Sequence, residues 1–156
     1  MEVNPTEKQI AEAVKIAGYA VASGSADEAR GRFEAEGLSF CWEVRGGSEA
    51  VFWTCIGTIP ENPPASLCES LLEANLLGAR TGGGAIGLYP PTRAAVYSVT
   101  LRLEGLDETA LAAMLRAFVS NVPGLVREFD LAQPAGAGES EPPSGPELFS
   151  AGMLWV

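Results

Sequence analysis

The sequence predicts an α+β fold in which a twisted antiparallel sheet packs with helices, in the order α-β-β-β-α-β-β-α. Apolar residues recur at helical spacing in three segments and alternate along five others. Clusters of Pro, Gly, Asn and Ser separate these segments. Of the 156 residues, 47% are hydrophobic, which is enough for one domain with its own core and excludes a wholly disordered chain.

The first helix is predicted over residues 4–22. Asn4 is a suitable N-cap, Pro5 suits the first helical position, and Glu7 completes a capping box. The apolar stripe of this helix then consists of Ile10, Val14, Ala17 and Val21. The segment Ser23-Gly24-Ser25 ends the helical pattern.

Three strands are predicted next, over residues 30–36, 38–45 and 50–59, and residues 46–49 read as a four-residue hairpin loop. The register that follows gives each apolar side chain an apolar partner: Val44 faces Val51, Trp42 faces Trp53, and Phe40 faces Cys55. This register is therefore favoured over a slip of one residue. The opposite face still carries Phe52 and Ile56, which indicates a sheet that is partly apolar on both sides.

The second helix is predicted from an Asn62 cap, with Pro63 at its first position, to about Leu77, and Gly78 fits the position after its end. Its apolar side chains cover more than half of the circumference: Leu67, Cys68, Leu71, Leu72, Leu76 and Leu77. A helix of this kind is buried on two sides, either inside one monomer or between two monomers. Glu69 and Glu73 form its narrow solvated face rather than a catalytic carboxylate pair.

Strands over residues 85–89 and 94–103 follow, joined by a turn at Pro90-Pro91-Thr92. A third helix begins near Asp107 and has an apolar stripe of Leu111, Met114, Leu115, Phe118 and Val122. Pro123-Gly124 is expected to stop or kink it, although the apolar residues beyond suggest another turn or two.

The composition divides the chain into three parts. Residues 1–131 form the domain, residues 132–146 are a linker rich in Pro, Gly and Glu, and residues 147–156 are apolar again. We expect Leu148–Val156 to dock on a groove of the domain, since exposed apolar side chains favour aggregation. A disordered tail, or one ordered only by contacts with neighbouring molecules, is the alternative.

Charge and composition exclude several classes of function. The net charge of −10 disfavours binding to nucleic acids and anionic membranes. The N-terminal segment has no apolar signal-peptide core and no continuous apolar run is long enough to span a bilayer, so we expect a cytoplasmic protein. The chain has no histidine, which removes the commonest general base and His-ligated metal sites, and an enzyme is not expected.

No cofactor or metal is expected either. Cys41, Cys55 and Cys68 lack metal-ligand spacing and are interpreted as small buried hydrophobic residues. A Cys41–Cys55 disulfide is the alternative, but the register above places the two side chains on opposite faces. Residues 82–87 match G-x-G-x-x-G, but here a helix precedes and a strand follows, the reverse of a dinucleotide site. Trp42 and Trp53 could stack a ligand, although a cross-strand core pair is the favoured interpretation.

Residues 67–122 resemble the class I chaperones of type III secretion. The resemblance is carried by LLEANLLG (71–78), TGGGAIGLYP (81–90), the alternating strand that follows, and GLDETAL (105–111) at the start of the last helix. This chain departs from the family at Pro90-Pro91, where a different turn is usual, and at Pro123-Gly124, which interrupts the last helix.

The resemblance implies a small, acidic, cytoplasmic homodimer that binds the N-terminal region of a secreted effector protein and keeps it export-competent. It implies a dimer interface built from Leu71, Leu72, Leu76, Ile86 and Leu88. It also implies an effector-binding surface that contains Ile10, Val14, Phe52 and Ile56. The alternative is a regulatory or structural dimeric protein with the same fold and no secretion client.

Overall fold

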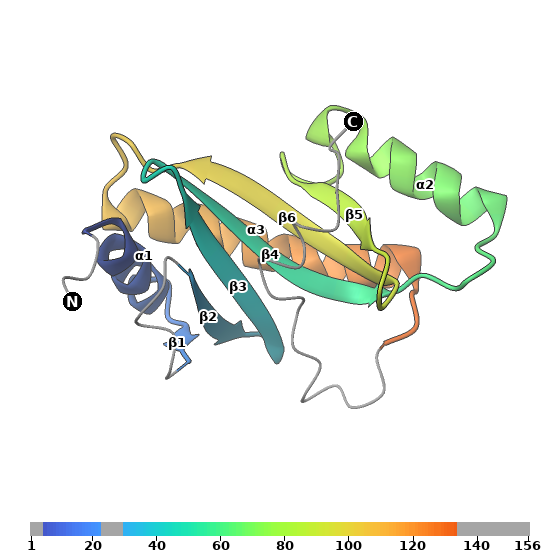
Figure 1. Cartoon of the computed structure of the whole chain (residues 1–156), viewed down its shortest axis with the longest axis horizontal. Coiled ribbons are helices and arrows are strands. Elements are labelled where there is room, and N and C mark those ends of the chain that lie inside the picture. Colours follow the sequence, from blue (N-terminus) through green and yellow to red (C-terminus); the bar gives the residue numbers. More distant parts are fainter. Residues whose placement is uncertain (1–4, 23–29, 134–156) are drawn as a thin grey trace.

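The computed structural model describes residues 5–22 and 30–133 (Figure 1). The helices and strands follow the predicted order, with one additional two-residue strand near the N-terminus. Their bounds are α1 (Pro5–Ile16), β1 (Ala20–Val21), β2 (Arg30–Ala35), β3 (Leu38–Arg45), β4 (Glu49–Thr58), α2 (Ala65–Asn75), the 3-10 turn η1 (Leu76–Gly78), β5 (Ala85–Tyr89), β6 (Ala94–Arg102) and α3 (Glu108–Phe129).

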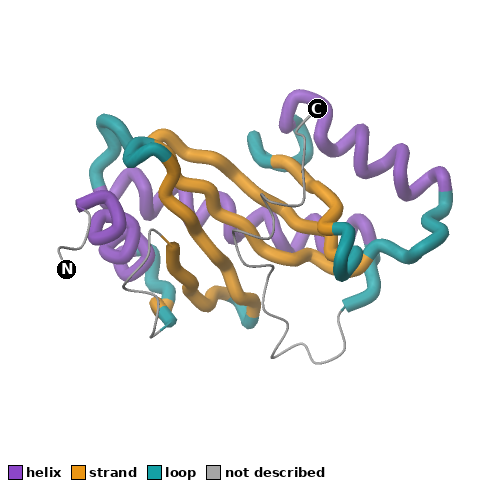
Figure 2. The backbone as a smooth tube through the Cα atoms, viewed as in Figure 1, coloured by secondary structure: helices purple, strands orange, loops and turns teal. Residues whose placement is uncertain are grey.

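The strands form one antiparallel sheet in the order β1-β2-β3-β4-β6-β5. Figures 1 and 2 show α3 running behind the sheet and α2 standing beyond the β5 edge. The predicted α+β fold is therefore confirmed. Helices α1 and α3 pack against each other and share the main core with one face of the sheet. We call this face the inner face, and the face turned away from the helices the outer face.

The main core lies between the inner face and the two helices. Its largest buried side chains come from β2, β3, β4, β6, α1 and α3: Phe33, Phe40, Phe52, Tyr97, Ile10, Ile56, Leu111 and Leu115. Phe33 stacks on Phe40 with ring centroids 5.1 Å apart, and Phe118 meets the ring of Phe40 edge-on at 5.7 Å. These aromatic contacts join the sheet to α3 and fix which strand faces turn inward.

The predicted register of the β3–β4 hairpin is wrong by one residue. Arg45 pairs with Glu49, so the loop has three residues rather than four. Gly46 and Gly47 both have positive φ, 56° and 73°, a conformation that glycine adopts without steric cost and that allows the shorter loop. Either register places apolar side chains opposite one another, because β4 is apolar on both of its faces.

The slip moves every β4 side chain to the other face relative to β3. Trp42 pairs with Phe52 on the inner face, whereas Trp53 pairs with Cys41 on the outer face, so the predicted Trp42–Trp53 pair is wrong. Cys41 and Cys55 share the outer face, contrary to the argument made against a disulfide, although both are free thiols. Cys68 is exposed and is therefore not the buried residue expected from the sequence.

The helix boundaries also differ from the sequence predictions. Helix α1 ends at Ile16 rather than at residue 22, because Gly18 (φ 91°) closes it with a Schellman motif. In this motif the N–H of Tyr19 donates to the carbonyl of Val14 at 3.1 Å, and the N–H of Gly18 donates to Lys15 at 2.9 Å. Helix α2 begins at Ala65, after Pro64 rather than at Pro63.

Helix α3 begins as predicted, with the Asp107 side chain accepting a hydrogen bond from the N–H of Ala110 at 2.7 Å. It continues through Pro123 to Phe129, because Pro123 lies on the exposed side while Leu125 and Phe129 are buried. By length and composition alone, α3 is long and apolar enough to cross a membrane, contrary to the expectation from the sequence. Its buried residues form the side that joins the main core, as in a core helix of a globular domain.

The described chain ends beside β4. The N–H of Thr58 donates to the carbonyl of Ala132 at 2.8 Å, and Leu131 is buried against Gly57. The predicted linker and apolar segment lie outside the described residues from residue 134 onward.

Gly31 is required by the packing of the inner face, and its replacement tests that packing. A Cβ at residue 31 would lie 1.9 Å from Cζ2 of Trp42, so we expect Gly31→Ala to lower the free energy of unfolding by about 1–3 kcal/mol. Gly124→Ala is the matched control, because its Cβ would meet no atom within 4 Å in helix α3, and it should stabilise by about 0.5–1 kcal/mol. Urea unfolding at equal protein concentration measures both, and equal effects would contradict the packing described above.

Candidate functional site

Helix α2 exposes a row of leucine side chains at the edge of the molecule. Leu72 is 72% exposed, and Leu76 and Leu77, which follow in η1, are 66% and 96% exposed. Leu77 also has a positive φ of 54°, unfavourable for a residue with a Cβ, so its side chain is directed outward at a conformational cost. We call Leu72, Leu76 and Leu77 the leucine row.

The other side of α2 is attached to the domain. Ala74 is fully buried in the main core, and Leu67 and Leu71 pack against that core. The side chain of Asn75 makes two hydrogen bonds to the backbone of Ile86 in the edge strand β5. Its Nδ2 donates to the carbonyl of Ile86 at 2.8 Å, and its Oδ1 accepts from the N–H of Ile86, also at 2.8 Å. Asn75 thus takes the place of a neighbouring strand at this point of the sheet edge.

The glycine-rich segment between η1 and β5 is a structural loop. The hydroxyl of Tyr97 donates to the carbonyl of Thr81 at 2.7 Å, and the hydroxyl of Thr81 donates to Gly84. A Cβ at Gly84 would lie 2.5 Å from the carbonyl oxygen of Ser98, so glycine is needed for close approach to β6. Burial raises the pKa of the Tyr97 hydroxyl, so it remains a hydrogen-bond donor at neutral pH.

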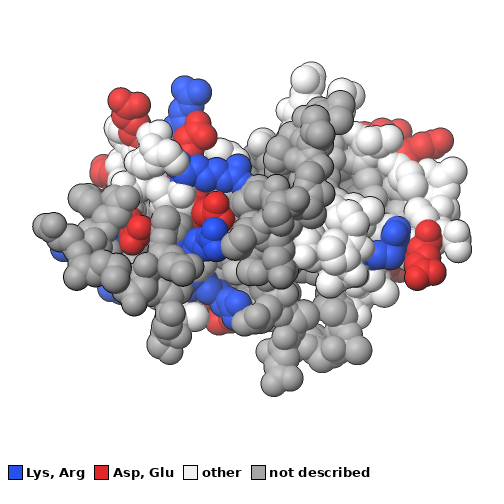
Figure 3. All heavy atoms as spheres, in the orientation of Figure 1, with Lys and Arg blue, Asp and Glu red and all other residues white. Residues whose placement is uncertain are grey.

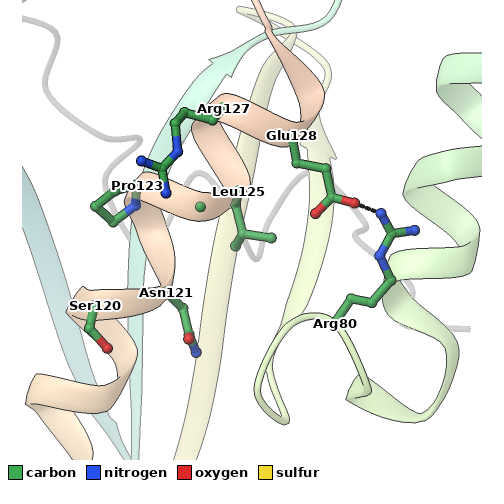
Figure 4. A pocket seen from close by; sticks show the side chains of 8 residues that line it. Arg80, Ser120, Asn121, Pro123, Leu125, Arg127 and Glu128 are labelled. Carbon is green, nitrogen blue, oxygen red and sulfur yellow. Dashed lines mark ion pairs between the residues drawn. The ribbon is translucent and has the colours of Figure 1, made fainter.

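A shallow pocket of about 290 Å³ lies beside this loop, next to the C-terminal half of α3 (Figure 4). Its lining residues are Arg80, Ser120, Asn121, Pro123, Gly124, Leu125, Arg127 and Glu128. Arg80 forms an ion pair with Glu128 and lies 3.8 Å from a carboxylate oxygen of Glu73, so carboxylates of this chain already satisfy it. The two pairs connect α2 and the loop to α3 and give the pocket a structural role.

The structure places the predicted dimer-interface residues in two groups. Leu72 and Leu76 are exposed and Leu71 is half-buried on the same helix, whereas Ile86 is buried and Leu88 is half-buried in the adjacent strand β5. The predicted interface therefore contains an accessible part on α2 and a supporting part on β5. Leu77, which the sequence prediction did not include in the interface, is the most exposed of these leucines.

The four residues predicted to bind an effector do not form a surface. Ile10, Val14, Phe52 and Ile56 are each 0% exposed, in the main core between the inner face of the sheet and the helices. The one-residue register error explains Phe52 and Ile56, which were expected on the face opposite Trp42 and instead share its face. In this arrangement the four side chains stabilise the fold and are not available to a partner.

A second apolar cluster, which the sequence analysis missed, lies on the outer face of the sheet. It consists of Cys41, Val51, Trp53, Tyr89, Ala94 and Val96, with Cys55 packed against it. We call this set the outer cluster. It contains strand residues only, so none of the described helices contributes to it. Alternation in β4 and β6 was the signal that could have revealed it, had the hairpin register been correct.

Charged side chains lie beside the outer cluster, at the end of the strands near the β3–β4 turn. Figure 3 shows this band of alternating basic and acidic side chains across the outer face. Glu43 lies 3.2 Å from Arg30 and 3.9 Å from Arg45, and Glu49 lies 3.6 Å from Arg102. Arginines therefore outnumber carboxylates here, although the whole chain carries a net charge of −10.

The described residues show groups suited to binding rather than to chemistry. Among residues 5–22 and 30–133, no three Cys, Asp or Glu side chains come together as a possible metal site. Burial raises the pKa of the Cys55 thiol, so it stays protonated and poorly nucleophilic at neutral pH. What the geometry offers is an exposed leucine row and an apolar sheet face flanked by arginines.

Comparison with protein families decides the classification. The family model for the Tir chaperone protein (CesT) family matches residues 36–125, more than half of the chain. The chain belongs to this family. The matched region of this CesT-family protein begins just before β3 and ends within α3, so it includes the outer cluster, the leucine row and Asn75. The predicted resemblance to type III secretion chaperones is confirmed.

Solved structures share the fold. The complex ExoU–SpcU from the type III secretion system of Pseudomonas aeruginosa contains a chain with a TM-score of 0.58 and 18% identity, covering 81% of this chain and 98% of that one. The Yersinia pestis type III secretion chaperone SycH, in complex with a fragment of YscM2, gives a match with a TM-score of 0.57, 16% identity and coverages of 76% and 98%.

The HopA1–SchA chaperone–effector complex gives a match with a TM-score of 0.56, 9% identity and coverages of 80% and 91%. Comparison with curated protein sequences finds no significant match. The shared fold extends over nearly the full length of the matched chains.

The Asn75 hydrogen bonds should hold α2 of this CesT-family protein on β5. Asn75→Asp keeps the side-chain shape but replaces the amide donor with an oxygen that faces the carbonyl of Ile86. We expect a loss of about 1–3 kcal/mol of stability and faster hydrogen exchange at the amides of β5. Asn62→Asp, at an exposed position before α2, is the control and should change neither quantity. Unchanged exchange in β5 would show that Asn75 does not hold the helix there.

Proposed function

We propose that this chain is a homodimeric, cytoplasmic type III secretion chaperone that binds the N-terminal region of a secreted effector protein and keeps it export-competent. The observation that carries the proposal is the exposed leucine row of α2 in a member of the Tir chaperone family. The complexes of the related fold, among them a chaperone with its effector, support a protein partner.

Dimerisation through α2 follows from the energetics of the leucine row. Burying a leucine side chain stabilises by about 2 kcal/mol, so six leucines in a two-fold dimer contribute roughly 12 kcal/mol. Association costs about 4–15 kcal/mol, so the leucine row alone comes close to balancing this cost. Half-buried neighbours such as Leu71 and Leu88 therefore need to contribute additional area. The interface proposed here shares Leu71, Leu72, Leu76 and Leu88 with the one that the family resemblance implies, and adds Leu77.

The effector surface that we propose is the outer face of the sheet. The core residues expected from the sequence lie between the sheet and the helices α1 and α3, whereas the outer cluster, although its members are also buried, has no described helix packed on it. An extended effector segment can place apolar side chains on this cluster and acidic side chains near Arg30, Arg45 and Arg102. The β5 edge is less suitable for strand addition, because the Asn75 side chain already forms hydrogen bonds with the N–H and the carbonyl of Ile86.

Binding rather than catalysis is the role that we propose. A chain without histidine lacks the usual general base, and burial holds the Cys55 thiol in its unreactive form. A chaperone needs complementary surface rather than reactive groups, and both surfaces described above are of that kind. The alternative, a regulatory or structural dimer without a secretion client, differs only in the identity of the bound partner.

Leu72→Glu tests the dimer. The side chain is 72% exposed in the monomer, so the fold should survive, whereas a charge in an apolar interface should shift the molar mass from twice 16.3 kDa towards 16.3 kDa. Met114→Glu, on the exposed side of α3, is the matched control and should leave the dimer intact. Light scattering at micromolar concentration, with circular dichroism as a check on folding, distinguishes the two. A wild-type mass of one subunit would refute dimerisation.

Co-purification tests the effector. The tagged full-length chain, expressed in its native host, should retain a secreted protein, and a fragment from the N-terminal region of that protein should rebind to the purified chain. The bound fragment should remain open to proteolysis at its unbound ends, as expected for a non-globular segment. Val96→Lys, in the outer cluster, should weaken rebinding by at least about tenfold, whereas Lys8→Glu on α1 should not. A partner that is never secreted would favour the regulatory alternative.

A further inference from the structure

The described chain ends where the outer cluster begins. The bridge between Thr58 and Ala132 is antiparallel, so the last described residues, up to residue 133, run in the direction opposite to β4. The side chain of Gln133 donates to the carbonyl of Ile56 at 3.3 Å, which places residue 133 close to Cys55 of the outer cluster. Residues 134–156 therefore start beside this cluster rather than near the leucine row of α2.

The outer cluster is buried although it lies on the face of the sheet turned away from α1 and α3. Trp53 is 2% exposed and Val51 is 3% exposed, although the described helices contribute nothing to this face. The chain contains one further apolar segment, LFSAGMLWV, over residues 148–156. We propose that Leu148–Val156 docks on the outer cluster of the same chain and covers it when no effector is bound.

The reach of the connecting residues fits this docking. Residues 134–147 span an r.m.s. distance of roughly 20 Å and at most about 50 Å. The outer cluster extends across β3, β4, β6 and β5, neighbours about 4.8 Å apart, so every part of it lies within roughly 15 Å of the strand from which the chain departs. Tethering at this distance gives an effective concentration on the order of 1 mM, so an intrinsic dissociation constant of about 0.1 mM leaves roughly 90% of the clusters covered.

Charge complementarity supports the same occupant. Residues 134–156 contain Glu139, Glu141 and Glu147 and no Lys or Arg. The band beside the outer cluster contains an excess of arginines, among them Arg102, whose side chain is 87% exposed. The arginines of this band attract the carboxylates of the linker. This attraction offsets the repulsion between the linker and the other carboxylates of the acidic chain.

Docking would also set the affinity for an effector, and this part rests on the proposed function. If covered molecules outnumber open molecules by about tenfold, the apparent affinity of a competing ligand for the cluster falls by about the same factor. The C-terminal segment then acts as an internal substitute for effector, released when an effector of sufficient affinity arrives. The empty chaperone is thereby kept from exposing an apolar sheet face.

Alkylation of the cysteines tests docking without any effector. Cys41 and Cys55 belong to the outer cluster, while Cys68 is exposed on α2 and serves as the internal reference. The full-length variant with Leu148, Phe149, Met153, Leu154 and Trp155 replaced by Ser should raise the alkylation rate of Cys55 about tenfold, by the arithmetic of a covered fraction near 90%, and leave that of Cys68 unchanged. A control with Ser140 and Ser144 replaced by Ala should alter neither rate.

Two comparisons decide between the possible covers. In the Leu72→Glu background, protection of Cys55 that persists and is independent of protein concentration supports docking within one chain. Protection that disappears on dilution would show that a second copy covers the cluster and would overturn the proposal. Equal alkylation of Cys55 in the five-serine variant and the wild type would overturn it as well, with unchanged circular dichroism confirming that the variant is folded.

Titration with the effector fragment separates the two proposals. If the five-serine variant shows faster Cys55 alkylation and binds the fragment about tenfold more tightly, docking and competition both hold. If alkylation increases while affinity for the fragment is unchanged, the segment docks but the effector uses another surface, and the proposed effector site fails. If neither changes, docking itself is refuted, whatever the fragment binds.

Discussion

Strand β4 carries apolar side chains on both of its faces, and the arrangement of the rest of the chain depends on this. Its inner side chains, Phe52 and Ile56, complete the core with α1 and α3. Its outer side chains, Val51 and Trp53, are the centre of a second cluster. Because β4 is apolar on two sides and pairs with both β3 and β6, it connects the stable part of the domain to the face proposed for partners.

Helix α2 shows a different division of roles along one element. One side is fixed to the domain by Ala74 in the core and by the Asn75 side chain on β5, while the opposite side presents leucines to solvent. The ion pair of Arg80 with Glu128 anchors the following loop to α3. A rigidly held apolar surface loses little conformational entropy on association, so this attachment favours a specific contact over a loose one.

The sequence was sufficient for the order of the elements and for the exact bounds of β3 and β5, because alternation and helical spacing are local signals. It was insufficient wherever two arrangements satisfied the same local pattern. The β3–β4 register is the clearest case: β4 can present Phe52 or Trp53 to the core, and the structure has Phe52 inside, with the shorter loop closed by the positive φ of Gly46 and Gly47. Phe52 and Ile56 were assigned to the wrong face of the sheet for this reason, and the outer cluster was missed with them.

The end of α1 failed for a related reason, since the apolar stripe continues to Val21 while Gly18 terminates the helix. The exposed leucines of α2 were anticipated because a helix with so many apolar positions exceeds what one domain can cover. The attachment of Asn75 to β5 has consequences for assembly. If the leucine row forms the proposed two-fold dimer, the same patch of each copy lies on the symmetry axis, and Asn75 already occupies this point of the β5 edge. Growth by successive strand pairing at this point of the edge would require displacing that side chain, so the proposed dimer would favour closed pairs over open polymers.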